Sequence, residues 1–126
     1  TCSTLPGRLV CRLVWDMDKQ MCSEYQEKAR RTQNDALTIN MKRQHALYGL
    51  AGEVGEVLSI YQKELQGHTA TREKVLEEMG DCLWMLAELC DCLGASMEDV
   101  AEANIQKLLG RYPNRFSVEK SIHREG

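Results

Sequence analysis

Helix breakers and long apolar runs are both scarce in this sequence. Proline occurs only at Pro6 and Pro113, so nothing between them forbids long helices. Strand-like alternation, internal repeats and Pro/Ser-rich linkers are absent. No apolar run approaches the roughly 20 residues that span a bilayer, so we expect no membrane partner. These absences favour an all-α fold.

A surplus of positive charge is also missing. The 126 residues carry 16 Lys and Arg against 19 Asp and Glu, which gives a net charge of -3. This balance provides no basic field for DNA or RNA, so we expect no nucleic-acid partner. A polyanionic substrate would therefore need a metal ion or a few placed cations. The length supports one domain with one core.

Cysteine pairs with metal-binding spacing are absent, although the chain holds six cysteines. No CxxC occurs, which argues against a zinc site. Cys82, Cys90 and Cys92 fall mostly among apolar residues of one helical segment, where a thiol behaves as a small hydrophobe. We therefore expect reduced thiols and a cytoplasmic location.

The chain divides into three predicted parts. In residues 1–20, Arg8, Arg12 and Asp16 interrupt the apolar stretch that a signal peptide needs, so we expect an N-terminal extension there. Residues 21–113 form the predicted domain. Residues 114–126 are a predicted tail, which must dock on something or stay mobile.

Helix caps and apolar spacing predict the helices of the domain. Their approximate ranges are 23–31, 41–66, 71–93 and 96–112, with weaker helical character already from residue 35. The capping box Ser23-Glu24-Tyr25-Gln26 starts the first helix, and Ser96 caps the last. Gly67 and Gly94 end the middle two.

Apolar side chains recur at three- and four-residue steps along the two middle helices. These stripes consist of Leu47, Leu50, Ala51, Val54, Val57, Leu58, Tyr61 and Leu65, and of Val75, Met79, Cys82, Leu83, Leu86, Leu89, Cys90 and Leu93. Amphipathic helices joined by short loops predict a four-helix bundle.

Four acidic residues are candidates for more than surface charge. Glu53 and Glu56 project as neighbours on one helix, and Glu78 and Asp81 do so on the next. If the two helices pack antiparallel, the four carboxylates can converge, and oxygen ligands of this kind suit Mg²⁺ or Mn²⁺. Ordinary surface charge is the competing interpretation, since ExxE is common in helices.

Other acids of the third helix fall opposite its apolar stripe, where a solvated face is expected. These are Glu73, Glu77, Glu88 and Asp91.

Three glycines interrupt the second helix beside its acidic pair. Gly49, Gly52 and Gly55 each cost about 1 kcal/mol against alanine in a helix interior. Their presence predicts a close approach by another helix or by a ligand.

Asn104, Lys107 and Arg111 share one face of the last helix. A carboxamide and two cations suit phosphate oxygens. The competing interpretation is that cations near a helix C-terminus are stabilised by the helix dipole and need no ligand.

Several motifs together resemble one protein family. They are Tyr48-Gly49-Leu50-Ala51-Gly52-Glu53-Val54-Gly55-Glu56-Val57, Glu77-Glu78-Met79-Gly80-Asp81-Cys82-Leu83-Trp84, Asn104-Ile105-Gln106-Lys107-Leu108 and Arg111-Tyr112-Pro113. Over about residues 23–124 the chain is similar to MazG-type nucleotide pyrophosphohydrolases of the all-α NTP pyrophosphatase superfamily, single-domain phage-like subgroup.

The resemblance implies a set of functional expectations. Glu53, Glu56, Glu78 and Asp81 would hold Mg²⁺ and form the catalytic centre, and Asn104, Lys107 and Arg111 would contact the triphosphate. A nucleoside triphosphate would be hydrolysed to the monophosphate and pyrophosphate, in a homodimer or homotetramer. The two-domain arrangement of long bacterial members is not expected, because the acidic signature occurs once.

Candidates for base recognition rest on sequence position alone. Gln26 and Trp84 are predicted by position to line a base pocket, as are Thr32, His45 and Tyr48. Packing at a subunit interface is the favoured alternative for Trp84, and a structural or surface role for His45.

Three other functions compete with this interpretation. A non-catalytic helical oligomerisation or binding module would be indicated by loss of an acidic ligand, yet all four are present. A hydrolase of a related phosphoribosyl nucleotide would keep the metal site and change the pocket. A di-metal redox bundle is excluded, because it needs Glu-x-x-His pairs and none occurs.

Overall fold

The computed structural model describes residues 21–123, and these form helices and turns without any strand. A first helix covers residues 21–30. It is followed by α2 (Ile39–Leu65), α3 (Arg72–Cys92), α4 (Met97–Arg111) and the short α5 (Val118–Ile122). The predicted all-α fold is therefore confirmed. The predicted extension, residues 1–20, lies outside the described residues.

Local capping chemistry sets most of the helix ends. Thr38 caps α2 by accepting a hydrogen bond from the Met41 amide at 3.2 Å. Ser96 caps α4 in the same way through the Asp99 amide at 3.1 Å, as its position predicted. The left-handed φ angles of Gly67 and Gly94, 95° and 63°, confirm both as helix terminators.

Ser23 does not start the first helix, because Met21 and Cys22 are already helical. The predicted capping box is therefore wrong. Serine is tolerated inside the first turns of a helix, so its presence fixes no start by itself. The predicted break after this helix is confirmed as a turn over residues 31–38.

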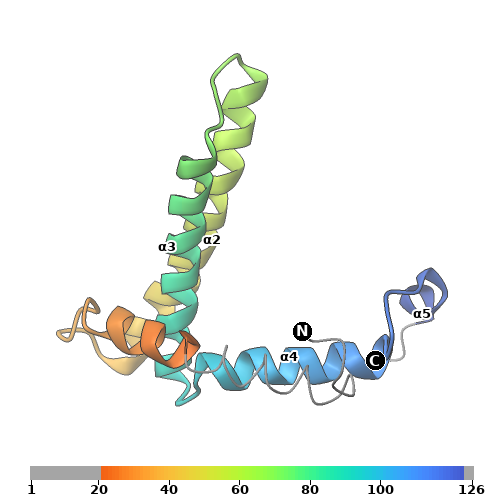
Figure 1. Cartoon of the computed structure of the whole chain (residues 1–126). Helices are drawn as coiled ribbons and strands as arrows, with labels where there is room; N and C mark the ends of the chain where they lie inside the picture. Colours follow the sequence, from red (N-terminus) through yellow and green to blue (C-terminus); the bar gives the residue numbers. More distant parts are fainter. Residues whose placement is uncertain (1–20, 124–126) are drawn as a thin grey trace, which may run out of the picture.

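The two longest helices form an antiparallel hairpin that is the main body of the molecule (Figure 1). We call the end with the turn over residues 66–71 its tip, and the end near Ile39 and Cys92 its base. The helix over residues 21–30 crosses this base, whereas α4 leaves the base and projects away from the hairpin. The predicted tail contains α5, which Ser117 caps.

Few side chains are buried in the part of the chain that the structure describes. Among residues 21–123, the buried apolar residues are Ala29, Ala46, Ala87 and Cys90. Many residues of the predicted apolar stripes stay exposed, including Leu58 at 64% and Leu65 at 90%. The stripes therefore form faces of the hairpin that the described part of the chain does not cover.

None of the helices within residues 21–123 is both long enough and apolar enough to cross a bilayer. The four cysteines of this region, Cys22, Cys82, Cys90 and Cys92, are free thiols.

Candidate metal site and its surroundings

The hairpin brings acidic side chains of its two helices together midway along its length. One carboxylate oxygen from each of Glu53, Glu78 and Asp81 lies within 4.8 Å of the others. We call these three residues the acid cluster. Their convergence follows from the antiparallel packing of α2 and α3, since the sequence places one acidic pair on each helix.

The electrostatics of Glu78 reflect this crowding. Partial burial is the largest cause that raises its pKa, followed by the charges of Asp81, Glu53 and Glu56. Glu56 is therefore close enough to act on Glu78, although it lies outside the three-oxygen group. Like charges held this close favour the uptake of a proton or a cation.

The donor set fits a hard divalent cation. Carboxylate oxygens from two helices can take the protein-side positions of Mg²⁺ or Mn²⁺ and leave others for water or substrate. Asp81 is exposed, and Glu53 and Glu78 are half-buried, so a ligand can reach the cluster from solvent.

Gly49 explains how the helices pack next to the acid cluster. A Cβ atom at this position would stand 2.5 Å from Sδ of Met85, closer than real Cβ contacts allow. The predicted close approach by another helix is thus confirmed at Gly49. At Gly52 and Gly55, no neighbouring atom of the described residues lies within 4 Å of such an atom.

The predicted phosphate-binding residues do not join the acid cluster within one chain. Asn104, Lys107 and Arg111 lie on α4, which projects away from the hairpin (Figure 1). Asn104 and Lys107 are exposed and Arg111 is half-buried. Their phosphate-binding role stays a prediction.

The candidate base-pocket residues have different surroundings. The indole nitrogen of Trp84 donates a hydrogen bond to the Thr32 hydroxyl at 2.7 Å, and its ring meets the His45 ring edge-on at 6.1 Å. Tyr48 is 73% exposed. The pKa of Tyr25 is raised by burial and then by the charge of Asp81.

Gln26 is only 4% exposed, and its carboxamide is engaged within the chain. Its Nε2 donates to Asp91 at 2.9 Å and to the Ala95 carbonyl at 3.1 Å, and its Oε1 accepts from the Met97 amide at 2.8 Å. Gln26 thus ties the first described helix to the end of α3 and the start of α4. The base-contact role stays a prediction, and these bonds leave it little capacity for a ligand.

Glu88 and Asp91 are predicted as solvated surface charge, but the structure covers both side chains, which corrects that interpretation. Glu88 is 1% exposed, and one of its oxygens lies 2.5 Å from Nδ1 of His45. Asp91 accepts hydrogen bonds from Gln26, Arg30 and Gln33. The face opposite the apolar stripe of α3 is covered by α2 and by residues 21–33, and a wheel for one helix cannot show that.

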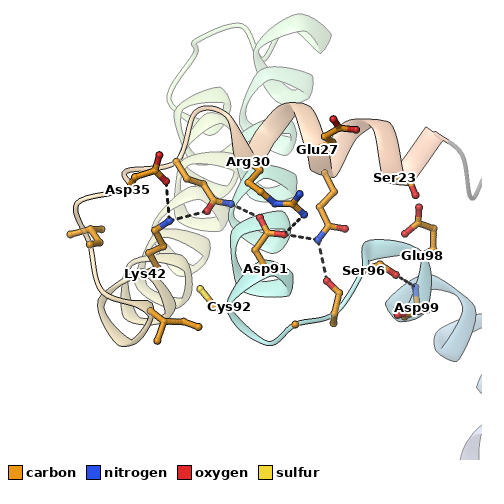
Figure 2. Close-up of a pocket in the computed structure, with 16 residues that line it drawn as sticks. Ser23, Glu27, Arg30, Asp35, Lys42, Asp91, Cys92, Ser96, Glu98 and Asp99 are labelled. Carbon is orange, nitrogen blue, oxygen red and sulfur yellow. Dashed lines mark hydrogen bonds and ion pairs between the residues drawn. The ribbon is translucent and has the colours of Figure 1, made fainter.

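An open pocket of about 930 Å³ lies at the base of the hairpin, and sequence reasoning missed it (Figure 2). Residues of the first described helix, the following turn, the start of α2, the end of α3 and the start of α4 line it, and the acid cluster does not. Glu98 on its wall is 8% exposed, and one buried oxygen of its carboxylate has no hydrogen-bond partner among residues 21–123.

Comparisons with known proteins bear on this geometry. The family described as "MazG nucleotide pyrophosphohydrolase domain" matches residues 41–116. The "Uncharacterized protein YvdC" of Bacillus subtilis (strain 168) is 30% identical over 69 residues, which are 49% of this chain and 65% of that protein. The chain thus matches just under two thirds of that relative's length. No solved structure matches the chain significantly.

Proposed function

The chain belongs to the MazG nucleotide pyrophosphohydrolase family, and from this premise we propose that it hydrolyses nucleoside triphosphates to the monophosphate and pyrophosphate with Mg²⁺ or Mn²⁺. The observation that carries the proposal is the convergence of Glu53, Glu78 and Asp81 across the hairpin. Phosphoryl chemistry needs concentrated positive charge beside the phosphate oxygens, and a net charge of -3 does not supply it.

In the proposed reaction the acid cluster holds the cation, with Glu56 beside it. A cation held there would supply positive charge beside the α-phosphate and the departing pyrophosphate. Glu56 is exposed and lies outside the three-oxygen group, so it is our candidate for the general base. It takes the proton of a water whose oxygen bonds to the α-phosphorus, while the bond from that phosphorus to the bridging oxygen breaks.

Asn104, Lys107 and Arg111 contact the β- and γ-phosphates in this proposal. Because α4 leaves the hairpin, we place these residues against the acid cluster of a second copy of the chain. The exposed apolar faces of α2, α3 and α4 support assembly into a homodimer or homotetramer, because isolated chains would leave them in water.

A mixing experiment tests the shared site. Variants Asp81→Asn and Lys107→Ala, each of low activity alone, are produced together so that mixed oligomers form. A site shared between copies restores part of the activity, because one site of each mixed dimer is then intact. Activity that stays at the level of the separate variants contradicts the shared site.

The activity itself is tested with a panel of NTPs and dNTPs in the presence of Mg²⁺. Pyrophosphate and monophosphate are the expected products. Glu53→Gln and Asp81→Asn should each lower turnover at least about a hundredfold, which is the usual effect of losing one catalytic group. Glu64→Gln and Glu73→Gln are the matched controls, because both residues are exposed acids of the same two helices.

Two outcomes contradict the proposal. Release of orthophosphate places the cleavage at another bond, and wild-type turnover in folded Glu53→Gln and Asp81→Asn removes the acid cluster from the reaction. A cytoplasmic setting is part of the proposal, supported by the free thiols within residues 21–123.

A further inference from the structure

Besides the acid cluster, one polar pair, His45 with Glu88, joins the two helices of the hairpin between that cluster and the base. Glu88 on α3 is 1% exposed, and Nδ1 of His45 on α2 lies 2.5 Å from its carboxylate. This contact occupies Nδ1, whichever of the two partners carries the hydrogen. Nε2 is then the other hydrogen-bonding atom of the ring, and the His45 side chain is 47% exposed.

The pair is aligned with the acid cluster along the interface of α2 and α3. Three contacts follow one another: Glu53 with Asp81, Gly49 with Met85, and His45 with Glu88. At a rise of about 1.5 Å per residue, the pair lies roughly 10–12 Å along the hairpin from the acid cluster.

The strip between the two polar groups is apolar and flanked by an aromatic ring. Met85 lies directly on the backbone of Gly49, where any side chain would displace it. The Trp84 ring stands edge-on to His45, and its hydrogen bond to Thr32 fixes its orientation. An apolar floor, one aromatic wall and a single oriented polar group are typical of sites for a flat heterocyclic ligand.

A role confined to joining the two helices accounts poorly for the pair. Burying a carboxylate is costly even when it is paired, and apolar side chains of similar volume hold helices together at least as well. The pair does something that an apolar contact cannot do, which is to fix the tautomer and direction of a half-exposed imidazole.

We propose that His45 binds the nucleoside part of the substrate through Nε2, and that Glu88 is its positioning residue. The inference rests on the proposed function, since phosphates held at the acid cluster leave the nucleoside to extend over Met85 toward Trp84 and His45. The ligand group is a hydrogen-bonding atom of the nucleoside, from either the base edge or a sugar hydroxyl.

The test compares His45→Ala and His45→Phe with His68→Ala, which removes an exposed histidine near the hairpin tip. For the His45 variants we expect KM for nucleoside triphosphates to rise about tenfold, the effect of one hydrogen bond, at nearly unchanged kcat. Inhibition by magnesium tripolyphosphate, which has no nucleoside, should be unchanged. His68→Ala should behave as wild type.

Glu88 variants separate orientation from simple structure. Glu88→Gln keeps an oxygen that accepts from Nδ1 and should change KM little. Glu88→Leu releases the ring and should raise KM as His45→Ala does, with no further rise in the double variant. A Glu88→Leu protein that fails to fold leaves His45→Phe as the deciding variant, because it retains the ring volume.

The substrate panel distinguishes the two sources of the ligand group. If the His45 variants lose the differences in KM among bases, the contact is to the base edge. If they lose the difference in KM between ribose and deoxyribose substrates, the contact is to the sugar. Unchanged KM in both His45 variants overturns the inference. Weaker inhibition by tripolyphosphate also overturns it, because His45 then acts on the phosphates.

Calorimetric binding of nucleoside monophosphates separates this inference from the proposed function. If the wild-type protein binds them without hydrolysing any triphosphate, the proposed activity fails. Weaker monophosphate binding by His45→Ala alone then still supports the nucleoside contact. Equal binding by wild type and His45→Ala, or no binding by either, overturns it.

Discussion

Replacing Asp91 by alanine should release the first described helix from the hairpin. Asp91 accepts hydrogen bonds from Nε2 of Gln26 at 2.9 Å, from Arg30 at 2.8 Å and from Nε2 of Gln33 at 2.6 Å. Its own side chain is 14% exposed. One carboxylate therefore connects residues 26–33 to the end of α3.

The three contacts do not contribute equally. The Arg30 side chain is 56% exposed, so its ion pair is a surface pair worth less than about 0.5 kcal/mol. The Gln26 and Gln33 amides are more buried, and each hydrogen bond to a charged group is worth about 1.5 kcal/mol. Asp91→Ala should therefore destabilise the fold by about 3 kcal/mol, or lower Tm by roughly 15 °C.

Urea and thermal unfolding at one fixed protein concentration measure this effect, since assembly would couple stability to concentration. Glu27→Ala is the control, because Glu27 is an exposed acid whose 3.6 Å pair with Arg31 is a surface pair. Hydrogen exchange should become faster across residues 21–30 in Asp91→Ala. A loss below about 0.5 kcal/mol, the usual range for a surface substitution, would refute the reasoning.

The same contacts predict a pH dependence. Burial raises the pKa of Asp91, but the hydrogen bonds from Arg30, Gln26 and Gln33 outweigh it and hold the pKa below its usual range. A depressed pKa adds stability that is complete above the unfolded-state value, about 3.9, and is lost as pH falls through the folded-state value. The stability gap between wild type and Asp91→Asn should therefore shrink below about pH 4.

Gly49, Glu78 and Trp84 each give one further prediction. Gly55→Ala should be more stable than Gly49→Ala by about 1 kcal/mol in urea unfolding, because only the second alanine forces the flexible end of the Met85 side chain to move. Equal stabilities would contradict this packing. With a chelator present, the Tm of the wild type should fall as pH rises through the raised pKa of Glu78, and Glu78→Gln should remove that fall. The same dependence of Tm on pH in both proteins would contradict the crowding of the carboxylates. Trp84→Phe loses one indole hydrogen bond and should cost about 1 kcal/mol in the same unfolding assay; no loss would leave that bond without a stabilising role.

The local features of the chain could be predicted from the sequence. Helix ends at Gly67, Gly94 and Ser96 follow from chemistry within a few residues, and the structure confirms them. The three-residue spacing within each acidic pair is likewise a local property. Their convergence in space needs one added assumption, the antiparallel packing of α2 and α3.

The antiparallel register of α2 and α3 also pairs His45 with Glu88. Once Glu53 is set against Asp81, stepping back eight residues on α2 and forward seven on α3 brings His45 to Glu88. Considering each helix alone hid this, because Glu88 lies opposite the apolar stripe of its own helix and was predicted to face water.

What the sequence by itself determined was where helices form, where they stop and which residues share a face, because backbone hydrogen bonding and capping act over about four residues. Only the tertiary structure decided which faces are covered. The partners of Glu88 and Asp91 lie 43 to 65 residues away in the chain, and the departure of α4 from the hairpin depends on packing at its base. Burial is a property of the surrounding elements, so no pattern within one helix can specify it.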